Sequence, residues 1–461
     1  MFTIRKARII TIAILVLIRL AYKDARYYYP TQSQNIINND MQNNTDIPEE
    51  SLPEHHISLP LNGTTYFDAI DTQGNRGYVA DPTLFRRSVL EWHEQYKNAT
   101  YWDRIQNYPN HNIGTNNFLH NDELSMDHIC SLTEATGSGK ELNDRGIKII
   151  TEYVKVDETP ILRKGCTESP PLSHERPKLF CGIYTHGPQR NFTRLSALSY
   201  GWKCDGFLAF STITAPKLGM VGLLHKGEEN YHNMVQKTRS IWSYVATHYI
   251  DQFDYFHIGG DDMHVLVENM RSLLLEYEED DSTKEQGRIF GQLASKGSQA
   301  LFLRGGGGYT IDRIGLKKLH DYMPNCASDV IRYDEDNVIT NCARRLGLHF
   351  GDNRDGCTGQ QRSHSVSPGI IANAKGVSNS AFDEQLRFWA SLQHPGSKDT
   401  SVKVGLQIGY YAASNHSVTF HELRYPVWLV RHHALLYRAC PSNSALGKMY
   451  SSNGQVYEVG A

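Results

Sequence analysis

The sequence lacks the patterns that mark several common classes of protein. None of its cysteines shows C-x-x-C spacing, so neither a zinc site nor a thioredoxin-type redox motif is indicated. It has no basic run outside the N-terminus, and its formal net charge is only -3. Its 26 tyrosines are spread out rather than interleaved with Lys and Arg. We therefore expect no nucleic-acid partner.

Long hydrophobic runs are also scarce, and the main one lies at the N-terminus. Basic residues precede an apolar run over residues 9–22 that contains one charge, Arg19. The run is short for a membrane span, but no clean small-x-small cleavage site follows it. An uncleaved signal anchor is predicted, and a cleaved signal peptide stays open as the alternative. The positive-inside rule then places residues 1–8 in the cytosol and the rest of the chain in the lumen.

Features downstream agree with a luminal chain. Residues 23–77 are poor in apolar residues and rich in Asn, Gln, Asp and Pro, which predicts a flexible stem. Residues 78–175 have aromatic and helical patches without a motif for chemistry, and are predicted to form a membrane-proximal extension of unknown role. The 8 cysteines favour disulfides in an oxidising compartment. Glycosylation sequons begin at Asn43, Asn62, Asn98, Asn191 and Asn415.

From about residue 176 the sequence alternates between strand and helix patterns. KLFCGIYT and CDGFLAFST predict strands, and RNFTRLSALSYGW between them predicts a helix. A longer amphipathic helix over residues 231–249 leads into a strand that ends at Gly260. This alternation predicts an α/β domain over residues 176–440, with a mainly parallel sheet covered by helices on both faces. Residues 441–461 are predicted to be a C-terminal tail.

Two acidic residues stand where that last strand stops. Asp261 and Asp262 occupy a predicted strand-to-helix turn at the carboxyl end of a strand, where open α/β sheets bind ligands. A carboxylate pair there is suited to hold a cation and, through it, a phosphate group. Gly and Asp are also common in ordinary turns and at helix caps, and the local sequence leaves this alternative open.

Several ordered segments resemble one known family. They are KLFCGIYTHGPQ, WKCDGFLAFST, the stretch that ends in DYFHIGGDDMHVLVENM, RGGGGYTI, DEDNVITNCARRLGLHFGDNRD and SVTFHE. Together, over about residues 178–437, they resemble the core 1 β1,3-galactosyltransferase family of the Fringe-like β1,3-glycosyltransferases. Motifs that match in order are more specific than any one of them. The resemblance implies a GT-A type, Rossmann-like fold, Mn²⁺ as the cofactor, and a single-pass type II Golgi membrane enzyme with a luminal catalytic domain.

The resemblance also implies metal ligands. Asp262 matches the family's metal-binding acid and Asp261 the acid before it, whereas Gly260 replaces the first acid of the family's triplet. Because Mn²⁺ prefers oxygen ligands, this replacement predicts weaker binding unless Asp261 or water fills the gap. His421 in SVTFHE matches the family's histidine ligand, and a packed or surface histidine is the alternative.

A catalytic base is implied by the acidic pair in DEDNVITNC. Asp336 matches the family's acid that takes a proton from the acceptor hydroxyl, a role for a carboxylate that is not on the metal. Acids at a predicted helix start also fit an N-cap stabilised by the helix dipole.

Glycines let the backbone approach sugars closely. The donor or acceptor sugar pocket is assigned to Gly306, Gly307, Gly308, Tyr309 and Glu335.

Other residues are assigned to the nucleotide and to disulfides. Thr185 and Gln189 follow the first strand, where the nucleotide commonly sits in such folds. Lys237 and Arg239 are suited to meet the diphosphate, although lysines and arginines on helices usually face solvent. The family pattern suggests disulfides between Cys181 and Cys204 and between Cys326 and Cys342, and spacing alone does not determine connectivity.

The function implied is inverting transfer of galactose from UDP-galactose to the 3-hydroxyl of GalNAc on Ser or Thr of an O-glycosylated protein. A Fringe-like β1,3-N-acetylglucosaminyltransferase is one alternative. A catalytically silent relative that binds glycoproteins or acts as a chaperone is another, and Gly260 is the feature that supports it. The presence of Asp262, Asp336 and His421 together favours the enzyme. A homodimer is a family expectation on which the sequence itself is silent.

Overall fold

A computed structural model describes the part of the chain that contains the predicted motifs. The described residues are 126–131, 146–147, 150–151, 154–171, 176–185, 190–212, 219–294, 302–365, 367–373 and 413–451. All of them belong to one compact unit, Ser58–Ala461. The predicted anchor and stem lie outside the described residues. Among the described residues, no helix is long and apolar enough to cross a membrane.

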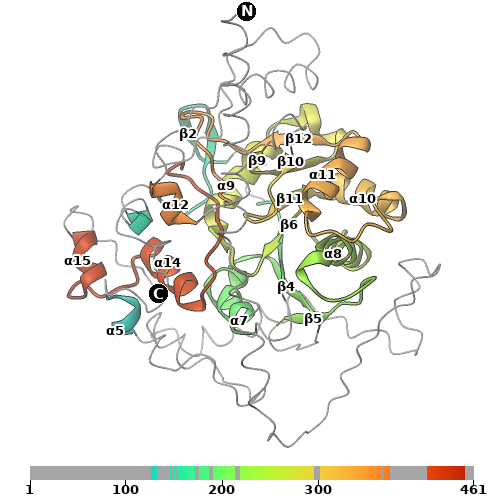
Figure 1. Ribbon diagram of the computed structural model, residues 1–461. Helices are drawn as coiled ribbons and strands as arrows, with labels where there is room; N and C mark the ends of the chain where they lie inside the picture. The colour runs from blue at the N-terminus through green and yellow to red at the C-terminus, as the bar shows by residue number, and fades with distance from the viewer. Residues whose placement is uncertain are drawn as a thin grey trace, which may run out of the picture. The chain divides into compact units, whose positions relative to one another are not determined.

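A seven-stranded sheet forms the centre of this unit (Figure 1). Its strands, in spatial order, are β12 (His349–Asp352), β8 (Arg288–Gly291), β11 (Tyr309–Asp312), β6 (Tyr255–Gly260), β3 (Leu179–Tyr184), β4 (Gly206–Ser211) and β5 (Met220–Gly222). β6, β3, β4 and β5 are parallel to one another, as predicted. β11 is antiparallel to both of its neighbours, because the chain reverses direction before it, so the sheet is mixed.

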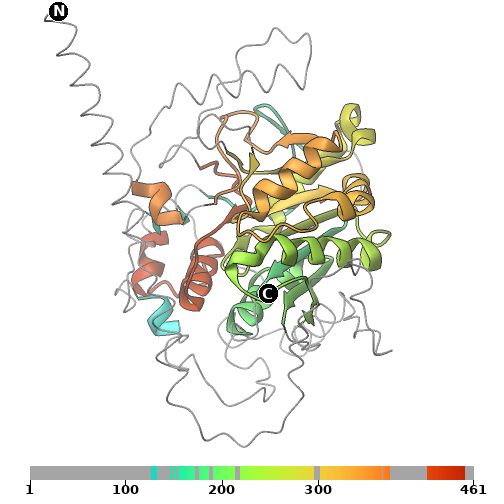
Figure 2. The same ribbon diagram turned by 45° about the vertical axis from the view of Figure 1, so that its right-hand side comes forward.

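Helices cover both faces of the sheet (Figures 1 and 2). One face carries α8 (Met234–Tyr249), α10 (Arg313–Tyr322) and α11 (Glu335–Arg345), and the other carries α7 (Arg190–Ser199) and α9 (Val267–Glu278). Alternate residues of each strand point to opposite faces. Phe180 therefore packs in the core with Trp242 of α8, whereas Leu179 and Cys181 pack with α9. Burying each such large apolar side chain contributes about 1.5–3 kcal/mol.

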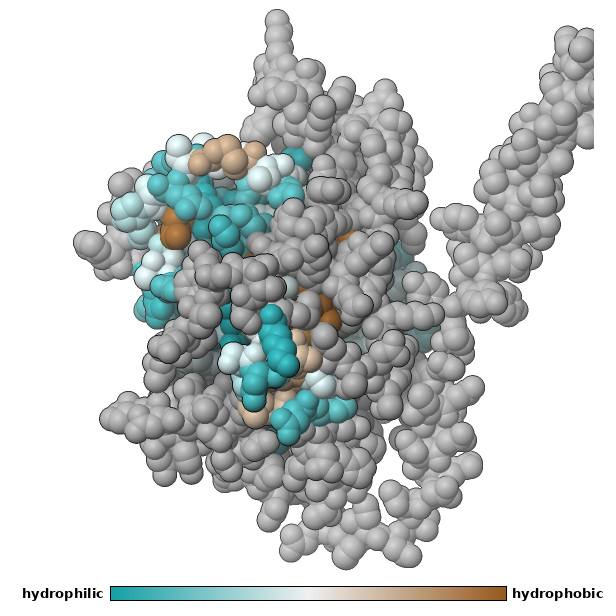
Figure 3. Space-filling model, turned by 90° about the vertical axis from the view of Figure 1, so that its left-hand side faces the viewer, coloured by the Kyte–Doolittle hydropathy of each residue, from teal (hydrophilic) through white to brown (hydrophobic). Residues whose placement is uncertain are grey.

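A third core joins segments from both ends of the described chain. α5 (Met126–Ile129), α14 (Pro426–Leu436) and α15 (Ala445–Ser451) contribute buried side chains to it, and the Cys130–Cys440 disulfide links the two ends. α12 (Pro368–Asn373) adds Ile371. On the face shown in Figure 3, the described surface is mostly hydrophilic, with hydrophobic residues in small separate areas. The apolar side chains of these helices are thus turned inward.

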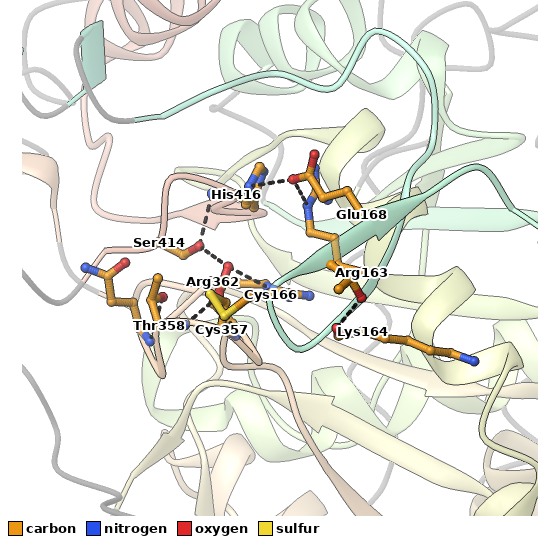
Figure 4. Close-up of a disulfide and its surroundings, with 12 residues drawn as sticks. Arg163, Lys164, Cys166, Glu168, Cys357, Thr358, Arg362, Ser414 and His416 are labelled. Atoms are coloured by element: carbon orange, nitrogen blue, oxygen red, sulfur yellow. Dashed lines mark hydrogen bonds and ion pairs between the residues drawn. A yellow bond between two sulfur atoms is a disulfide. The ribbon is translucent and has the colours of Figure 1, made fainter.

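The described residues form four disulfides, among them the two that the family pattern suggests, Cys181–Cys204 and Cys326–Cys342. Cys166 lies in the turn between β1 (Leu162–Lys164) and β2 (Thr167–Ser169), and its disulfide to Cys357 joins this hairpin to the segment after β12 (Figure 4). Beside it, buried Arg163 donates hydrogen bonds of 2.9 and 2.6 Å to both carboxylate oxygens of Asp157. The end of the predicted extension is therefore cross-linked to the predicted catalytic domain.

Candidate active site

The carboxyl ends of β3 and β6 lie side by side and bring two predicted residues together. Tyr184 is the register partner of Gly260, so Thr185 and Asp261 follow at the same edge of the sheet. The Thr185 hydroxyl donates a 2.6 Å hydrogen bond to Oδ2 of Asp261. Burial and the charge of Asp262 raise the pKa of Asp261 to about 7. Asp261 is therefore oriented toward β3, and it is partly protonated at neutral pH.

Asp262 pairs with His421, which comes from the far end of the domain. β7 (His264–Val265) and β13 (Thr419–Phe420) form an antiparallel pair, and the Leu423 amide donates to the Asp262 carbonyl at 3.0 Å. This pairing places Nε2 of His421 3.1 Å from Oδ1 of Asp262. Burial favours the neutral forms of both groups, but their mutual attraction outweighs it, lowering the pKa of Asp262 and raising that of His421.

Asp262 and His421 have side chains of the kinds that bind one cation together. Nδ1 of His421 lies 3.1 Å from the Ser365 carbonyl, to which it donates, so Nε2 is the nitrogen that faces Asp262. No group of three or more His, Cys, Asp or Glu side chains within the described residues is arranged to hold a metal ion. One carboxylate and one imidazole suit a divalent cation whose other ligands are water and phosphate oxygens, as is common for such cations. They are too few to coordinate a cation with protein ligands alone.

Gly260 lies directly beside this pair. A Cβ added to Gly260 would be 2.8 Å from Oδ1 of Asp262 and 3.5 Å from the ring of Tyr184. An acid at this position would therefore crowd Asp262 unless a cation drew the two carboxylates together. The missing first acid of the family pattern leaves Asp262 free of like-charge repulsion from residue 260.

The glycine run connects the His421 pair with the acids of α11. A Cβ on Gly305 would lie 2.3 Å from Oε1 of Glu335, and one on Gly306 would lie 2.4 Å from Nδ1 of His421. Neither position has room for a side chain. The other predicted pocket glycines pack close by: Gly307 lies against the His364 carbonyl, and Gly308 has a φ of +72° in the turn before β11. The RGGGGYTI segment thus contacts both parts of the predicted site, His421 on one side and Glu335 with Asp336 on the other.

Glu335 and Asp336 occupy the first turn of α11, as predicted. The Gly305 amide donates to Oδ2 of Asp336 at 3.1 Å, and the Asn337 amide donates to Oδ1 at 2.7 Å. Asp336 therefore faces the glycine run and accepts from one helix-terminal amide, but the N-cap of α11 is Asp334, so the N-cap alternative for Asp336 is wrong. Burial and the charge of Asp336 raise the pKa of Glu335 to about 8, and burial raises that of Asp336.

Two further residues at the site were not predicted from the sequence. Tyr184 ends β3, with its ring 3.5 Å from a Cβ built on Gly260, and burial and the nearby charges of Glu335 and Asp262 raise its pKa. Arg304 precedes the glycine run, donates to Oγ of Ser365 at 3.2 Å and brings a positive charge near Asp336. Burial lowers the pKa of Arg304. The sequence signal that could have identified Arg304 is its position at the start of RGGGGYTI.

The remaining predicted residues have other contacts or lie outside the described residues. Lys237 is buried, and it donates to the Thr185 carbonyl and forms an ion pair with Glu229, so it does not face solvent. Arg239 donates to the Met323 carbonyl at 2.6 Å. Tyr309 is buried in the core, where its hydroxyl accepts a 3.2 Å hydrogen bond from Trp242. Gln189 lies outside the described residues.

Comparison with known proteins supports a relationship to one family. No protein-family model matches the chain. The chain is 24% identical over 266 residues to glycoprotein-N-acetylgalactosamine 3-beta-galactosyltransferase 1 of Xenopus laevis, a match that covers 57% of this chain and 70% of that protein. The large mixed sheet with helices on both faces is compatible with a GT-A fold. These findings support a glycosyltransferase that is a distant relative of the core 1 β1,3-galactosyltransferase family.

Proposed function

We propose that this protein is an inverting, Mn²⁺-dependent glycosyltransferase of the secretory pathway. In this proposal it moves galactose from UDP-galactose to the 3-hydroxyl of GalNAc on an O-glycosylated protein. The observation that supports it best is the packing of one glycine run, with Gly306 on His421 and Gly305 on Glu335 and Asp336. A carboxylate–imidazole pair and a separate buried carboxylate thus meet at the carboxyl edge of the sheet, where α/β folds bind ligands.

Asp336 acts as the general base in this mechanism. It takes the proton from the acceptor hydroxyl while that oxygen bonds to the anomeric carbon of galactose. The bond from this carbon to the diphosphate breaks on the opposite face, and UDP leaves with the electron pair. Burial raises the pKa of Asp336, which makes it a stronger base than an exposed aspartate. Burial and the charge of Asp336 raise the pKa of Glu335, so the two neighbouring acids disfavour carrying two full charges together.

Asp262 and His421 are the residues that would hold Mn²⁺. The chemistry supplied by the bound ion is neutralisation of the charge on the diphosphate leaving group. His421 is oriented for this role by its hydrogen bond to the Ser365 carbonyl. Thr185 and Lys237 hold the end of β3 against Asp261, which keeps the edge of the sheet in place beside the pair. By this proposal the site faces the Golgi lumen, behind the N-terminal anchor.

The test uses the full-length chain purified from a eukaryotic secretory host. It is assayed with Mn²⁺, a GalNAc-α-Thr peptide, and UDP-galactose, UDP-GlcNAc or UDP-GalNAc as the donor. We expect galactose transfer that needs Mn²⁺ and falls at least about a hundredfold in Asp262→Ala, because charge on the leaving group is then less well stabilised. Asp321→Asn is the matched control, since this acid is exposed and pairs with Lys317 one turn away on α10.

Each alternative gives a different result in the same assay. Transfer of GlcNAc in place of galactose would correct the donor and keep the mechanism. The absence of transfer from every donor, together with no Mn²⁺-dependent binding of UDP by calorimetry, would overturn the proposal in favour of a silent glycoprotein-binding relative.

A further inference from the structure

Two stacked tyrosines stand exposed beside the candidate active site. Tyr231 lies in η5 (Tyr231–Asn233), just before α8, and Tyr333 lies just before α11. Their rings are 6.1 Å apart between centroids and 15° from parallel. Tyr231 is 72% exposed and Tyr333 is 49% exposed, and neighbouring Ile331 is 49% exposed. Single exposed aromatic residues are ordinary, but a stacked pair with an adjoining apolar residue suggests a contact surface.

The loop that carries Tyr333 is held rigidly, so the pair is fixed before any ligand binds. The Val235 amide donates to the Arg332 carbonyl at 3.0 Å, and the Gln236 side chain donates to the Val330 carbonyl at 2.7 Å. At the start of the loop the Cys326–Cys342 disulfide joins it to α11. Aromatic rings held in this way bind with little loss of conformational entropy.

The pair also lies within the electrostatic reach of the proposed catalytic acids. Tyr333 is three residues before Asp336 in the chain. Burial raises the pKa of Tyr231, and the charges of Glu335, Asp336 and Asp262 raise it further. Because Tyr333 leads directly into α11, an occupant of the pair would lie near Asp336, the proposed base for the acceptor hydroxyl. The reactant that must reach this acid is the acceptor sugar.

We propose that Tyr231 and Tyr333 form the surface on which the acceptor sugar stacks, so that its reacting hydroxyl points to Asp336. This inference rests on the proposed function. The C–H face of a pyranose ring is apolar and packs on an aromatic face, while tyrosine hydroxyls form hydrogen bonds with sugar hydroxyls. Stacking fixes the plane of the ring, and the position of the reacting oxygen relative to its base strongly affects the rate of transfer.

The experiment measures steady-state kinetics of the full-length protein with UDP-galactose and the GalNAc-α-Thr peptide. In Tyr231→Ala/Tyr333→Ala we expect the acceptor KM to rise about tenfold or more, because an exposed anchor pair is lost. The donor KM and the slow hydrolysis of UDP-galactose by water should stay at wild-type values. Tyr231→Phe/Tyr333→Phe keeps the rings and should stay close to wild type. Ile314→Ala, an exposed apolar residue at the opposite edge of the sheet, is the surface control.

The outcomes separate this inference from the proposed function. If the wild type transfers sugar and the double alanine variant keeps its acceptor KM, the acceptor surface is overturned while the transferase stands. A rise in the donor KM instead would show that the pair contacts the nucleotide, which also overturns it. If the wild type neither transfers nor hydrolyses any UDP-sugar, the proposed function fails, and this inference with it. Equal unfolding temperatures of the variants would show that they are folded.

Discussion

The two edges of the central sheet contain similar residue types but differ in how their charges are satisfied. A cavity of about 480 Å³ lies at the amino end of β6, next to Tyr255. Its charged side chains already have partners. Arg313 pairs with Asp254 at 2.8 Å, Lys284 pairs with Glu278 at 3.1 Å, and Arg288 donates to the Tyr277 carbonyl at 2.6 Å. Within the described residues, this edge has space and mostly paired charges, and burial raises the pKa of one lining acid, Asp312.

The carboxyl edge differs in how many of its acids lack a partner of opposite charge. Asp261, Glu335 and Asp336 all have raised pKa values, chiefly because they are buried. Their hydrogen bonds come mainly from Thr185 and backbone amides and not from opposite charges, although Arg304 lies near Asp336. Perturbed acids concentrated in one place are typical of functional sites. The proposed function therefore places the site where several acids lack a strong partner of opposite charge, and not at the cavity of the amino edge.

The largest expected effect compares two acids at helix starts, half-buried Asp336 at the carboxyl edge and buried Asp312 at the amino edge. Asp336→Asn should lower kcat by about a thousandfold, because the amide cannot accept the acceptor's proton. Asp312 is the N-cap of α10 at the amino edge and accepts a 2.7 Å hydrogen bond from the Gly315 amide. Asn is also a good N-cap, so Asp312→Asn should keep wild-type kcat. Equal losses of kcat in the two variants would contradict the comparison.

A second expected effect concerns the glycine run. In Gly306→Ala the added Cβ would meet the imidazole of His421, so His421 must move and the Asp262 pair is disturbed. We expect kcat to fall about a hundredfold, since small displacements in a catalytic group have effects of this size. Gly356→Ala is the control, because a Cβ there has no heavy atom closer than 3.5 Å. Full activity of Gly306→Ala would show that His421 has no part in the reaction.

The contribution to the pH dependence of stability should differ in sign between Glu335 at the carboxyl edge and Glu278 at the amino edge. Folded Glu335 has a pKa of about 8, whereas an unfolded glutamate is ionised above about pH 5. The folded state therefore binds more protons, and the free energy of unfolding should fall as pH rises from 5 to 8, by up to about 1.4 kcal/mol per pH unit from this group. Glu335→Gln should flatten that dependence, although the contribution of Asp261 remains.

Glu278 at the amino edge is the matched control for this measurement. Burial favours its neutral form, but the Tyr255 hydroxyl and Lys284 outweigh burial and lower its pKa. Glu278 is then ionised in both states above pH 5, and its contribution to stability is lost only as pH falls through its folded pKa. Glu278→Gln should leave the slope between pH 5 and 8 unchanged. Denaturant titrations at several pH values measure both variants, and equal slopes in Glu335→Gln and wild type would contradict the assignment.

The smallest expected effect is at the amino edge. Arg313→Ala removes the pair with Asp254, in which the two side chains are 44% and 39% exposed. Exposed ion pairs contribute little, so we expect the free energy of unfolding to fall by less than about 1 kcal/mol and kcat to stay at the wild-type value. Chemical denaturation and the transfer assay measure these quantities. A large loss of kcat would mean that the amino-edge cavity takes part in function after all.

Much of the fold was predictable because strands and helices leave local periodic patterns. The strands β3, β4 and β6 and the helices α7 and α8 lie where the apolar spacing predicted them. The turn at Asp261 and Asp262 also followed from local signals, whereas the helix that starts with Glu335 and Asp336 was implied by the family resemblance. The antiparallel insertion of β11 did not, because strand pairing depends on partners that are distant in the sequence.

The candidate site was predictable as a set of residues but not as an arrangement. Lys237 shows the difference: it was assigned to the diphosphate, with a solvent-facing position as the alternative, whereas packing buries it against Glu229 and the end of β3. The place of Tyr184 opposite Gly260 likewise depends on the register of β3 against β6.

The sequence by itself determined which residues end strands, begin helices and carry acid, because these properties depend on neighbours within a few positions. Only the tertiary structure decided that His421 meets Asp262 and that the glycine run packs against both His421 and the Glu335–Asp336 pair. It also decided which charged side chains have a partner of opposite charge and which do not. Burial and pairing depend on contacts between segments far apart in the chain, and these same contacts set the pKa values on which the proposed chemistry rests.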